Sequence, residues 1–348
     1  MLRDEDQRSD EASAAEGYVW PTQPFACVAG APRCGTTTLS RMLQSHPQVS
    51  FSEVKEPHFF SMIDLDEKND EDLTDFVAGH YLARYFPHVD PDARLIAEGS
   101  VSYLYAPERM RPILRLWPDA KFVISARDPL QLIPSLHQRL LYQGDEVEKD
   151  LERAWRLIEA RRNGRKIPRS CLDVRQLFYD EAGRFGKHVG RFFEVVGRER
   201  CHVILFDDLQ SDAGKVYEDL IAFLRLDPAP MPEEKARRVA RGFKIGWLQR
   251  LLKRPPVART VLAGQHFRKR VSDAPQREPS LASRKVMEAR MALLRWNRTA
   301  APKTRISAAL QDEIRETLRD DTLAFSRLIK RDLSHWLGGI GPSAEPAP

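Results

Sequence analysis

The residues best suited to chemistry lie in the run Phe-Ala-Cys-Val-Ala-Gly-Ala-Pro-Arg-Cys-Gly-Thr-Thr-Thr-Leu, from Phe25 to Leu39. This run predicts a buried strand, a turn bracketed by Gly30 and Gly35, and the start of a helix rich in hydroxyl groups. Glycine adopts backbone angles closed to other residues, so successive N–H groups can converge on a phosphate at the positive end of the helix dipole. The sequence therefore predicts an anion-binding loop.

The spacing of this loop is that of a P-loop, but Thr36 stands where a lysine is expected after the second glycine. A nucleoside triphosphatase needs that lysine against the β- and γ-phosphates, with magnesium bridging them. Its absence argues against ATP or GTP chemistry and favours a cradle for a single 5′-phosphate. Arg33, inside the loop, is the nearest cation and could meet a bridging oxygen. The alternative is an ordinary strand-turn-helix corner.

A second group of polar residues follows the predicted strand Lys121–Ala126. Arg127 comes directly after that strand, and Ser135 lies eight residues further on, near the first turns of the next helix. The planar fork of the arginine and the hydroxyl of the serine could jointly hold a second phosphate. An Arg-Asp-Pro turn is also a common capped helix start, and that alternative stays open.

A third group lies in Glu53–Phe60, after a short predicted strand. Pro57 restricts the backbone, and the two phenylalanines can anchor the segment in the core while Glu56 and His58 face a cleft. A carboxylate near a phosphate-binding arginine is what general-base chemistry on a hydroxyl requires. The alternatives are a surface salt-bridge glutamate and a structural histidine.

The elements that must position these groups alternate along the chain. Such alternation implies right-handed crossovers and an α/β fold with a central parallel sheet flanked by helices in three layers, like that of P-loop proteins. Ligands of such sheets bind beyond the carboxyl ends of the strands, where the three groups fall. Strands are predicted at Phe25–Ala29, Val49–Phe51, Leu95–Ala97, Lys121–Ala126 and Cys201–Phe206. Helices are predicted at Thr37–Ser45, Pro107–Leu116, Leu130–Tyr142, Leu151–Arg162, Val174–Val196, Ala213–Leu224, Gly246–Leu252, Ser283–Trp296 and Ser307–Leu328.

Composition and length are those of a globular protein with a full core. The 348 residues are 42% hydrophobic and 30% charged, and no apolar run reaches the eighteen residues needed to cross a bilayer. Residues 1–20 are predicted to be a disordered leader, 21–337 a single domain and 338–348 a disordered tail. The start of the chain, Met1–Gly17, is acidic, unlike a signal peptide, so a cytoplasmic location is expected. The cysteines are scattered without metal-ligand spacing, which supports neither zinc nor a disulfide framework: Cys27, Cys34, Cys171 and Cys201.

Charge is concentrated in one region of the chain. Residues 235–305 hold 20 Lys and Arg against 3 acids, a local +17, which leaves −12 of the total +5 for the rest. This asymmetry predicts an anionic partner for that region: an acidic glycan, a phosphorylated cofactor or an anionic membrane. No nucleic-acid-binding signature is recognisable there, so nucleic acid is not expected to be a partner. The segments Trp247–Arg254 and Val257–Leu262 could lie on a membrane, although a helix packed on its own domain would look the same.

Taken together, the loop Gly30–Leu39, the segment Lys55–Phe60 and the run Lys121–Pro129 with Ser135 resemble the sulfotransferase superfamily. The likeness is closest to its heparan-sulfate and bacterial carbohydrate branch. It extends through three further segments, so that it covers roughly residues 22 to 337: Phe192–Leu209, Leu220–Asp227 and Leu328–Leu337.

The resemblance implies in-line transfer of a sulfuryl group from 3′-phosphoadenosine-5′-phosphosulfate (PAPS) to an acceptor hydroxyl, on a carbohydrate or a glycolipid, without a metal. Glu56 would be the catalytic base and His58 its helper, and Arg127 and Ser135 would hold the 3′-phosphate. The 5′-phosphosulfate would be held by Arg33, Cys34, Gly35, Thr36, Thr37 and Thr38, and Arg33 would also offset charge on the bridging oxygen.

The chain departs from the family pattern in three places. Arg33 replaces a frequent lysine, and Glu98-Gly-Ser-Val101 replaces Glu-Lys-Ser/Thr-Pro, which removes a cation near the ligand. The cysteine-bracketed cofactor loop of the heparan-sulfate enzymes is not recognisable, and Arg268–Arg270 (Arg268, Lys269, Arg270) are candidate substitutes within 235–305. The other functions considered are a P-loop-like nucleotide kinase and a non-catalytic module that binds a nucleotide or an anionic surface.

Overall fold

The structure is a computed structural model that describes residues 20–232, 241–253, 281–300 and 306–338. The predicted leader and tail lie outside the described residues except for Trp20 and Gly338, and so do Arg268–Arg270. By contacts, the chain divides into two compact units. The first comprises Met1–Asp128, Phe185–Glu234 and Asp321–Leu333; the second comprises Pro129–Arg184, Lys235–Asp320 and Ser334–Pro348. The single domain over 21–337 that the sequence indicates stays a prediction.

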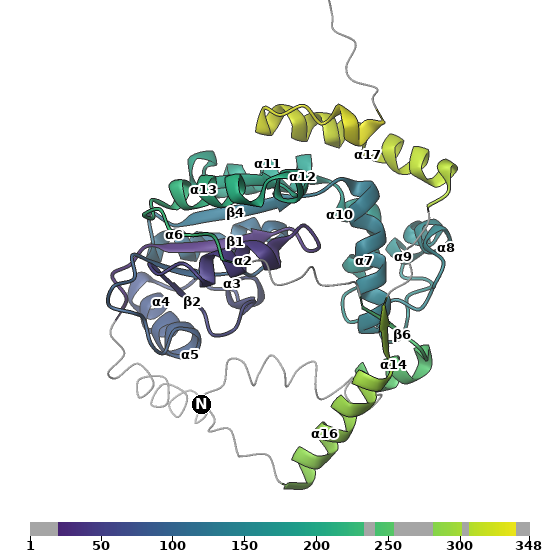
Figure 1. Cartoon of the computed structure of the whole chain (residues 1–348), viewed down its shortest axis with the longest axis horizontal. Coiled ribbons are helices and arrows are strands. Elements are labelled where there is room, and N and C mark those ends of the chain that lie inside the picture. The colour runs from purple at the N-terminus through teal and green to yellow at the C-terminus, as the bar shows by residue number, and fades with distance from the viewer. Residues whose placement is uncertain (1–19, 233–240, 254–280, 301–305, 339–348) are drawn as a thin grey trace, which may run out of the picture. The chain divides into compact units, whose positions relative to one another are not determined.

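The first unit is built on a five-stranded sheet in which every pairing is parallel. Figure 1 shows this sheet among its helices. All five predicted strands are present, with ends that differ by at most one residue. In spatial order the strands are β2 (Val49–Phe51), β3 (Leu95–Glu98), β1 (Phe25–Gly30), β4 (Lys121–Ala126) and β5 (Cys201–Leu205).

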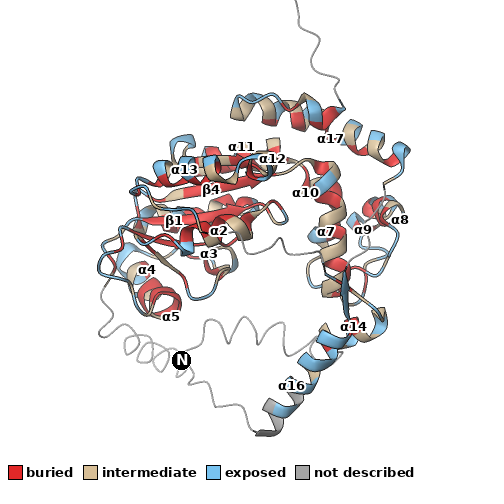
Figure 2. Cartoon of the chain, viewed as in Figure 1, coloured by how far each residue is buried: buried red, intermediate tan, exposed pale blue. Residues whose placement is uncertain are grey.

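Helices cover both faces of the sheet and bury it. On one face, side chains of β1 such as Val28 share a core with Leu43 and Leu220 from two helices. On the other face, the ring of Phe122 packs edge-on against Phe192 at 5.3 Å between centroids. The central strands β1 and β4 are buried, apart from the half-buried first residue of β4 (Figure 2), because parallel strands with helices on both sides have no face toward water. The predicted three-layer α/β fold is confirmed.

The helices of the first unit agree with the prediction where the apolar spacing is regular. Helix α2 begins one residue before the predicted start, and α13 has the predicted bounds. The segments between β2 and β3 contain helices for which no prediction was made. The elements are α2 (Thr36–Gln44), α3 (Phe59–Met62), α4 (Asp70–Val77), a π-helix at Ala78–Leu82, α5 (Ala83–Tyr85), 3-10 turns at Tyr103–Tyr105, Pro107–Met110 and Arg198–Arg200, α6 (Arg111–Leu116), α11 (Phe185–Val196), α12 (Phe206–Ser211), α13 (Ala213–Leu224) and the last part of α17 (Ala308–Ile329).

The second unit is mostly helical around its own core. Leu136 and Leu140 of α7 pack there with Trp155 of α8 and with Leu310 and Ile314 of α17. A short two-stranded antiparallel sheet that was not predicted also belongs to this unit. Its elements are α7 (Pro129–Gln143), α8 (Leu151–Arg156), α9 (Ile158–Arg162), a 3-10 turn at Val174–Leu177, α10 (Tyr179–Ala182), β6 (Arg241–Phe243), α14 (Gly246–Lys253), α16 (Leu281–Trp296), β7 (Arg298–Ala300), the first part of α17 and a 3-10 turn at Ser334–Leu337.

The prediction of one helix over Val174–Val196 was wrong. The segment holds a 3-10 turn and two helices, with breaks at Phe178 and near Gly183. A β-carbon on Gly183 would lie 2.8 Å from Leu318 Cδ1, so the chain approaches α17 too closely there for a side chain. The helical spacing on each side of this close approach is real, and tertiary packing interrupts it.

Candidate active site

The anion-binding loop predicted from the sequence follows β1 and leads into α2. Gly35 caps the helix with φ of 86°, a left-handed conformation that favours glycine. A β-carbon there would lie 2.6 Å from Leu209 Cδ2, so both the backbone angle and the space require glycine. Thr36, Thr37 and Thr38 form the first turn, where a helix leaves its first N–H groups without intrahelical partners, although the Thr38 N–H donates to the Gly35 carbonyl at 2.8 Å. The loop therefore runs through a left-handed glycine directly into the start of a helix, and its binding of an anion stays a prediction.

Neighbouring elements hold the loop in this shape. The Ala31 N–H donates to the Ser125 carbonyl of β4 at 2.8 Å, and the Ser125 hydroxyl donates to the Cys34 carbonyl. Arg33, within the loop, also has a left-handed φ, of 68°. Cys34 is buried, and burial raises the pKa of its thiol, so this cysteine acts as a packing group rather than a nucleophile.

Arg127, at the end of β4, lies against the anion loop. Its Nη1 donates to the Arg33 carbonyl at 3.1 Å, and its guanidinium carbon lies 4.2 Å from the centre of the Phe206 ring. Phe206 also lies beneath Gly35, at 2.9 Å from a β-carbon built on that glycine. Burial lowers the pKa of Arg127. An arginine side chain is thus fixed beside the loop, and its role in holding a phosphate stays a prediction.

The segment after β2 holds Glu56 between two cations or potential cations. Lys55 Nζ lies 2.5 Å from Glu56 Oε1, and His58 Nε2 lies 3.3 Å from Oε2. Burial would raise the pKa of Glu56, but the bonds from His58 and Lys55 outweigh it and lower the pKa from 4.5 to about 2. The glutamate side chain remains one-third exposed. It is therefore an ionised carboxylate that solvent or a ligand can reach.

His58 is fixed by the residues that follow β3. Its backbone N–H donates to Ser100 Oγ at 2.8 Å, and its Nδ1 lies 2.8 Å from Ser102 Oγ. The Gly99 N–H donates to the Lys55 carbonyl at 2.9 Å. The segment Gly99–Leu104 therefore holds the backbone on both sides of Glu56.

The same segment also contacts the anion loop. A β-carbon on Gly30 would lie 2.7 Å from Leu104 Cβ and 3.2 Å from the Val101 carbonyl oxygen. A β-carbon on Gly99 would lie 2.6 Å from Ser40 Oγ, on α2. One short segment thus packs against the anion loop, its helix and the segment that carries Glu56, which brings two of the three sequence motifs into one place.

Residues 24–230 match the model of the family described as the sulfotransferase family. The chain belongs to the sulfotransferase family. It is 24% identical over 230 residues to the bifunctional heparan sulfate N-deacetylase/N-sulfotransferase 1 of Caenorhabditis briggsae, covering 63% of this chain and 25% of that protein. It is 23% identical over 266 residues to carbohydrate sulfotransferase 15 of Mus musculus, covering 61% of this chain and 45% of that protein. The chain therefore spans only a quarter to just under half of these relatives.

A solved structure shares the fold of this family member. The sulfotransferase from Alicyclobacillus acidocaldarius matches with a TM-score of 0.59 at 23% identity, covering 91% of this chain and 99% of that one. The expected resemblance to sulfotransferases is thus confirmed at the level of family and fold, with heparan sulfate and carbohydrate sulfotransferases among the relatives.

Ser135, the remaining predicted site residue of this sulfotransferase, belongs to the second unit. It is the seventh residue of α7, in the second turn of that helix. Its pairing with Arg127 of the first unit stays a prediction.

Sequence reasoning missed Ser100 and Ser102 and saw Glu98 only as part of a departure from the family pattern. Glu98 ends β3 and is fully buried, and its carboxyl accepts a hydrogen bond from the Ser100 hydroxyl at 2.7 Å. The available signal was a glutamate at the end of an apolar strand, followed by a glycine and two serines close to the carboxyl edge of the sheet.

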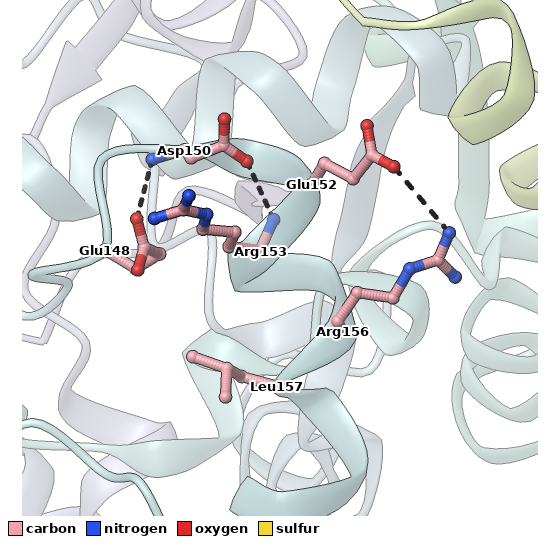
Figure 3. A pocket seen from close by; sticks show the side chains of 6 residues that line it. All are labelled: Glu148, Asp150, Glu152, Arg153, Arg156 and Leu157. Carbon is pink, nitrogen blue, oxygen red and sulfur yellow. Dashed lines mark hydrogen bonds and ion pairs between the residues drawn. The ribbon is translucent and has the colours of Figure 1, made fainter.

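A surface hollow of about 620 Å³ lies in the second unit, away from these motifs in sequence (Figure 3). Arg153 and Arg156 lie there among carboxylates, and Arg156 also pairs with Glu313. Charged groups that neutralise one another offer little to a ligand of either sign. The residues that line the hollow are Glu148, Asp150, Glu152, Arg153, Arg156 and Leu157.

Proposed function

We propose that this chain transfers a sulfuryl group from PAPS to a hydroxyl of a carbohydrate acceptor. The observation that carries the proposal is the segment Gly99–Leu104, which contacts both the anion loop and the backbone around Glu56. A phosphate cradle and an ionised carboxylate on one structural support are what transfer between a nucleotide and a hydroxyl requires. Membership of the sulfotransferase family supports sulfuryl rather than phosphoryl transfer.

The loop residues fit the donor. Gly30 and Gly35 both lack room for a β-carbon, and at Gly35 the left-handed backbone opens the start of α2 toward an anion. In the proposal, the loop residues from Arg33 to Thr38 bind the 5′-phosphosulfate, and Arg127 and Ser135 bind the 3′-phosphate. Arg33 could keep the positive charge while Thr36 occupies the position of the P-loop lysine.

The proposed reaction is an in-line displacement at sulfur. The acceptor oxygen forms a bond to sulfur as the bond from sulfur to the bridging phosphate oxygen breaks, and the acceptor proton passes to Glu56. The products are a sulfate ester and adenosine 3′,5′-bisphosphate. Negative charge grows on the bridging oxygen, where Arg33 and the loop amides would offset it.

The resting state of Glu56 adds a requirement to this mechanism. A carboxylate whose pKa is about 2 is fully ionised but has little tendency to accept a proton. Bound reactants would therefore have to draw Lys55 away from Oε1, which would raise the pKa of Glu56 and free an oxygen for the acceptor. A sulfuryl group carries the negative charge that could attract Lys55.

Substitution of Glu56 by glutamine tests the function. Loss of a positioned base typically lowers a rate by about 10² to 10⁴, so Glu56→Gln should transfer little labelled sulfate from PAPS to a desulfated heparan oligosaccharide. The variant should still be stabilised against heat by adenosine 3′,5′-bisphosphate. Glu53→Gln changes an exposed glutamate in the same segment and should behave as wild type.

Two results would contradict the proposal. Undiminished transfer by Glu56→Gln would show that Glu56 is not the base. Stabilisation by ATP with magnesium, and not by the bisphosphate, would favour a nucleotide kinase. Binding of the bisphosphate with no transfer by wild type to any acceptor class would favour the non-catalytic module.

The acceptor class is proposed from the relatives, whose names refer to heparan sulfate and carbohydrate. A lipid-linked sugar offers the same hydroxyl chemistry, and labelled sulfate transfer should be measured to it as well as to the oligosaccharide. A cytoplasmic location, expected from the sequence, stays a prediction that cell fractionation would test.

Peripheral contact with an anionic membrane is a second proposal, favoured by the surface of α14. Trp247 and Leu251 lie four residues apart on one side of this helix and are 62% and 47% exposed. Arg250 and Lys253 on the same helix could meet lipid phosphates. No helix in the described parts of the chain is long and apolar enough to cross a bilayer.

A further inference from the structure

Glu98 is a fully buried acid to which the proposed reaction gives no role. It ends β3, beside Cys27 of β1, and the sulfur of Cys27 lies 3.9 Å from its Oε1. The Ser100 hydroxyl donates to Oε2 at 2.7 Å, and Tyr103 hydrogen-bonds the same carboxyl. A buried carboxyl is unfavourable unless such bonds compensate for lost water, so its presence calls for a function.

A chain of hydrogen bonds leads from Glu98 to the segment that carries Glu56. The His58 N–H donates to Ser100 Oγ at 2.8 Å, and the Ser100 hydroxyl in turn donates to Glu98. With its donor directed at Glu98, the Ser100 oxygen presents a lone pair to His58. Both serine and carboxyl are fully buried, so water cannot compete for these bonds.

His58 needs this support because of its backbone conformation. Its φ is 56°, in the left-handed region that a β-carbon disfavours, and it stands directly before α3. From there its Nε2 lies 3.3 Å from Glu56 Oε2. A change of the His58 backbone toward the ordinary region would turn the imidazole and remove one of the two partners of Glu56.

We propose that Glu98 is a positioning residue that, through the Ser100 hydroxyl, holds His58 in its left-handed conformation and so fixes the orientation of Glu56. The inference rests on the proposed function for the role of Glu56 as base. Within the described part of the chain, Glu98 itself makes no hydrogen bond to Glu56 or to the anion loop.

The protonation of Glu98 is consistent with this role. Burial, with a smaller contribution from the nearby charge of Glu56, raises its pKa to about 7 against the bonds from Tyr103 and Ser100. The Cys27 thiol directs its weak donor at Oε1, and Oε2 accepts from Ser100. Glutamine keeps one oxygen that can accept from Ser100 in place of Oε2.

Three variants test the chain of bonds: Ser100→Ala, Glu98→Ala and Glu98→Gln. Amide hydrogen exchange over residues 53–62, measured without any ligand, should speed up at least tenfold in both alanine variants. Transfer of labelled sulfate from PAPS to a desulfated heparan oligosaccharide should fall about 10- to 100-fold in kcat, since a misplacement of about 1 Å can lower a rate 10²-fold. Affinity for adenosine 3′,5′-bisphosphate should stay within about twofold, and Glu98→Gln should be near wild type in all three measurements.

Ser50→Ala is the matched control. Ser50 Oγ, on β2, accepts the backbone N–H of Asp90 in a loop at 2.9 Å, which is the same kind of bond at another place. This variant should leave exchange over 53–62 and kcat unchanged. If Ser100→Ala keeps wild-type exchange and kcat, or if Glu98→Gln is as impaired as Glu98→Ala, the inference is wrong.

The two proposals fail in different ways. A wild-type protein that binds no bisphosphate and moves no sulfate would overturn the proposed function. The exchange measurement needs neither donor nor acceptor, and unchanged exchange over 53–62 in Ser100→Ala would overturn the role of Glu98 even in an active enzyme.

Discussion

At the scale of single residues, Arg127 is the most direct test of which nucleotide the protein binds. Arg127→Ala should weaken adenosine 3′,5′-bisphosphate much more than adenosine 5′-monophosphate, because only the first ligand carries the phosphate that the arginine would pair with. Charge-assisted bonds of this kind contribute about 1.5–3 kcal/mol, which is roughly a 10- to 100-fold change in Kd. Calorimetric titration of both nucleotides measures the difference.

Arg198 provides the control for that substitution. Arg198 stacks on Phe193 at 4.7 Å and donates to the Cys201 carbonyl at 2.7 Å. Arg127 makes the same two kinds of contact, with the Phe206 ring and the Arg33 carbonyl. Arg198→Ala should therefore reproduce any loss of packing without loss of nucleotide. Equal weakening of both nucleotides by Arg127→Ala would contradict a role at the 3′-phosphate.

Two carboxyl groups of this protein should shape its stability at opposite ends of the pH range. The folded pKa of Glu98 is raised from 4.5 to about 7, so its stabilising contribution is complete below about pH 4.5 and is lost as pH rises to 7. The folded pKa of Glu56 is lowered from 4.5 to about 2, so its contribution is present above about pH 4.5 and is lost as pH falls to 2.

Thermal unfolding of two variants across pH checks these signs. Relative to wild type, Glu98→Gln should gain stability between pH 5 and pH 8, by at most about 3 kcal/mol at 1.36 kcal/mol per pKa unit. Glu56→Gln should be less stable than wild type above pH 4.5, and this difference in stability should disappear as pH falls from 4.5 to 2. A constant difference between Glu98→Gln and wild type across pH 5–8 would show that Glu98 does not titrate there.

At the scale of elements, the turn from β1 into α2 depends on Gly35. Gly35→Ala should destabilise the protein by more than the roughly 1–2 kcal/mol of a left-handed alanine, because its β-carbon would also meet Leu209 at 2.6 Å. It should also abolish stabilisation by the bisphosphate. Denaturant unfolding with and without that ligand gives both quantities.

Gly164 separates the two effects of that substitution. Its φ is 72°, and a β-carbon there would meet nothing within 4 Å. Gly164→Ala should therefore show the cost of the backbone angle alone and leave ligand stabilisation intact. If Gly35→Ala lowers the free energy of unfolding no more than Gly164→Ala does, close packing around Gly35 does not determine the shape of the loop.

At the scale of the whole molecule, the uneven charge predicts selective contact with anionic surfaces. The full chain should sediment with vesicles that contain anionic lipid and not with neutral vesicles, and added salt should weaken the contact. Trp247→Ser with Leu251→Ser should reduce sedimentation severalfold, because both exposed apolar side chains of α14 are lost. Sedimentation that is the same with both vesicle types would contradict the proposal.

Leu172→Ser serves as the control for the vesicle experiment. Leu172 is 57% exposed and belongs to the same unit, outside α14. Its loss removes an exposed apolar side chain without changing the helix, so sedimentation should stay at the wild-type level.

Local chemistry in the sequence was enough to predict the sheet and the loops at its edge. The apolar runs at β1 and β4 are buried strands because residues of that kind, bounded by turn residues, have no other stable place. Gly30 and Gly35 predicted the tight turn between β1 and α2, whereas anion binding by this loop and by Arg127 stays a prediction. These features depend on neighbours in sequence, which is why they could be read from it.

Contacts between distant residues decided the rest. The hydrogen bond that the His58 N–H donates to Ser100 joins positions 42 residues apart, and no periodicity of the sequence predicts it. The role of Gly99–Leu104 as common support, the burial of Glu98 and the break of the predicted helix near Gly183 all follow from which surfaces pack together. Side-chain spacing records only local geometry, whereas packing between elements depends on the whole folded chain.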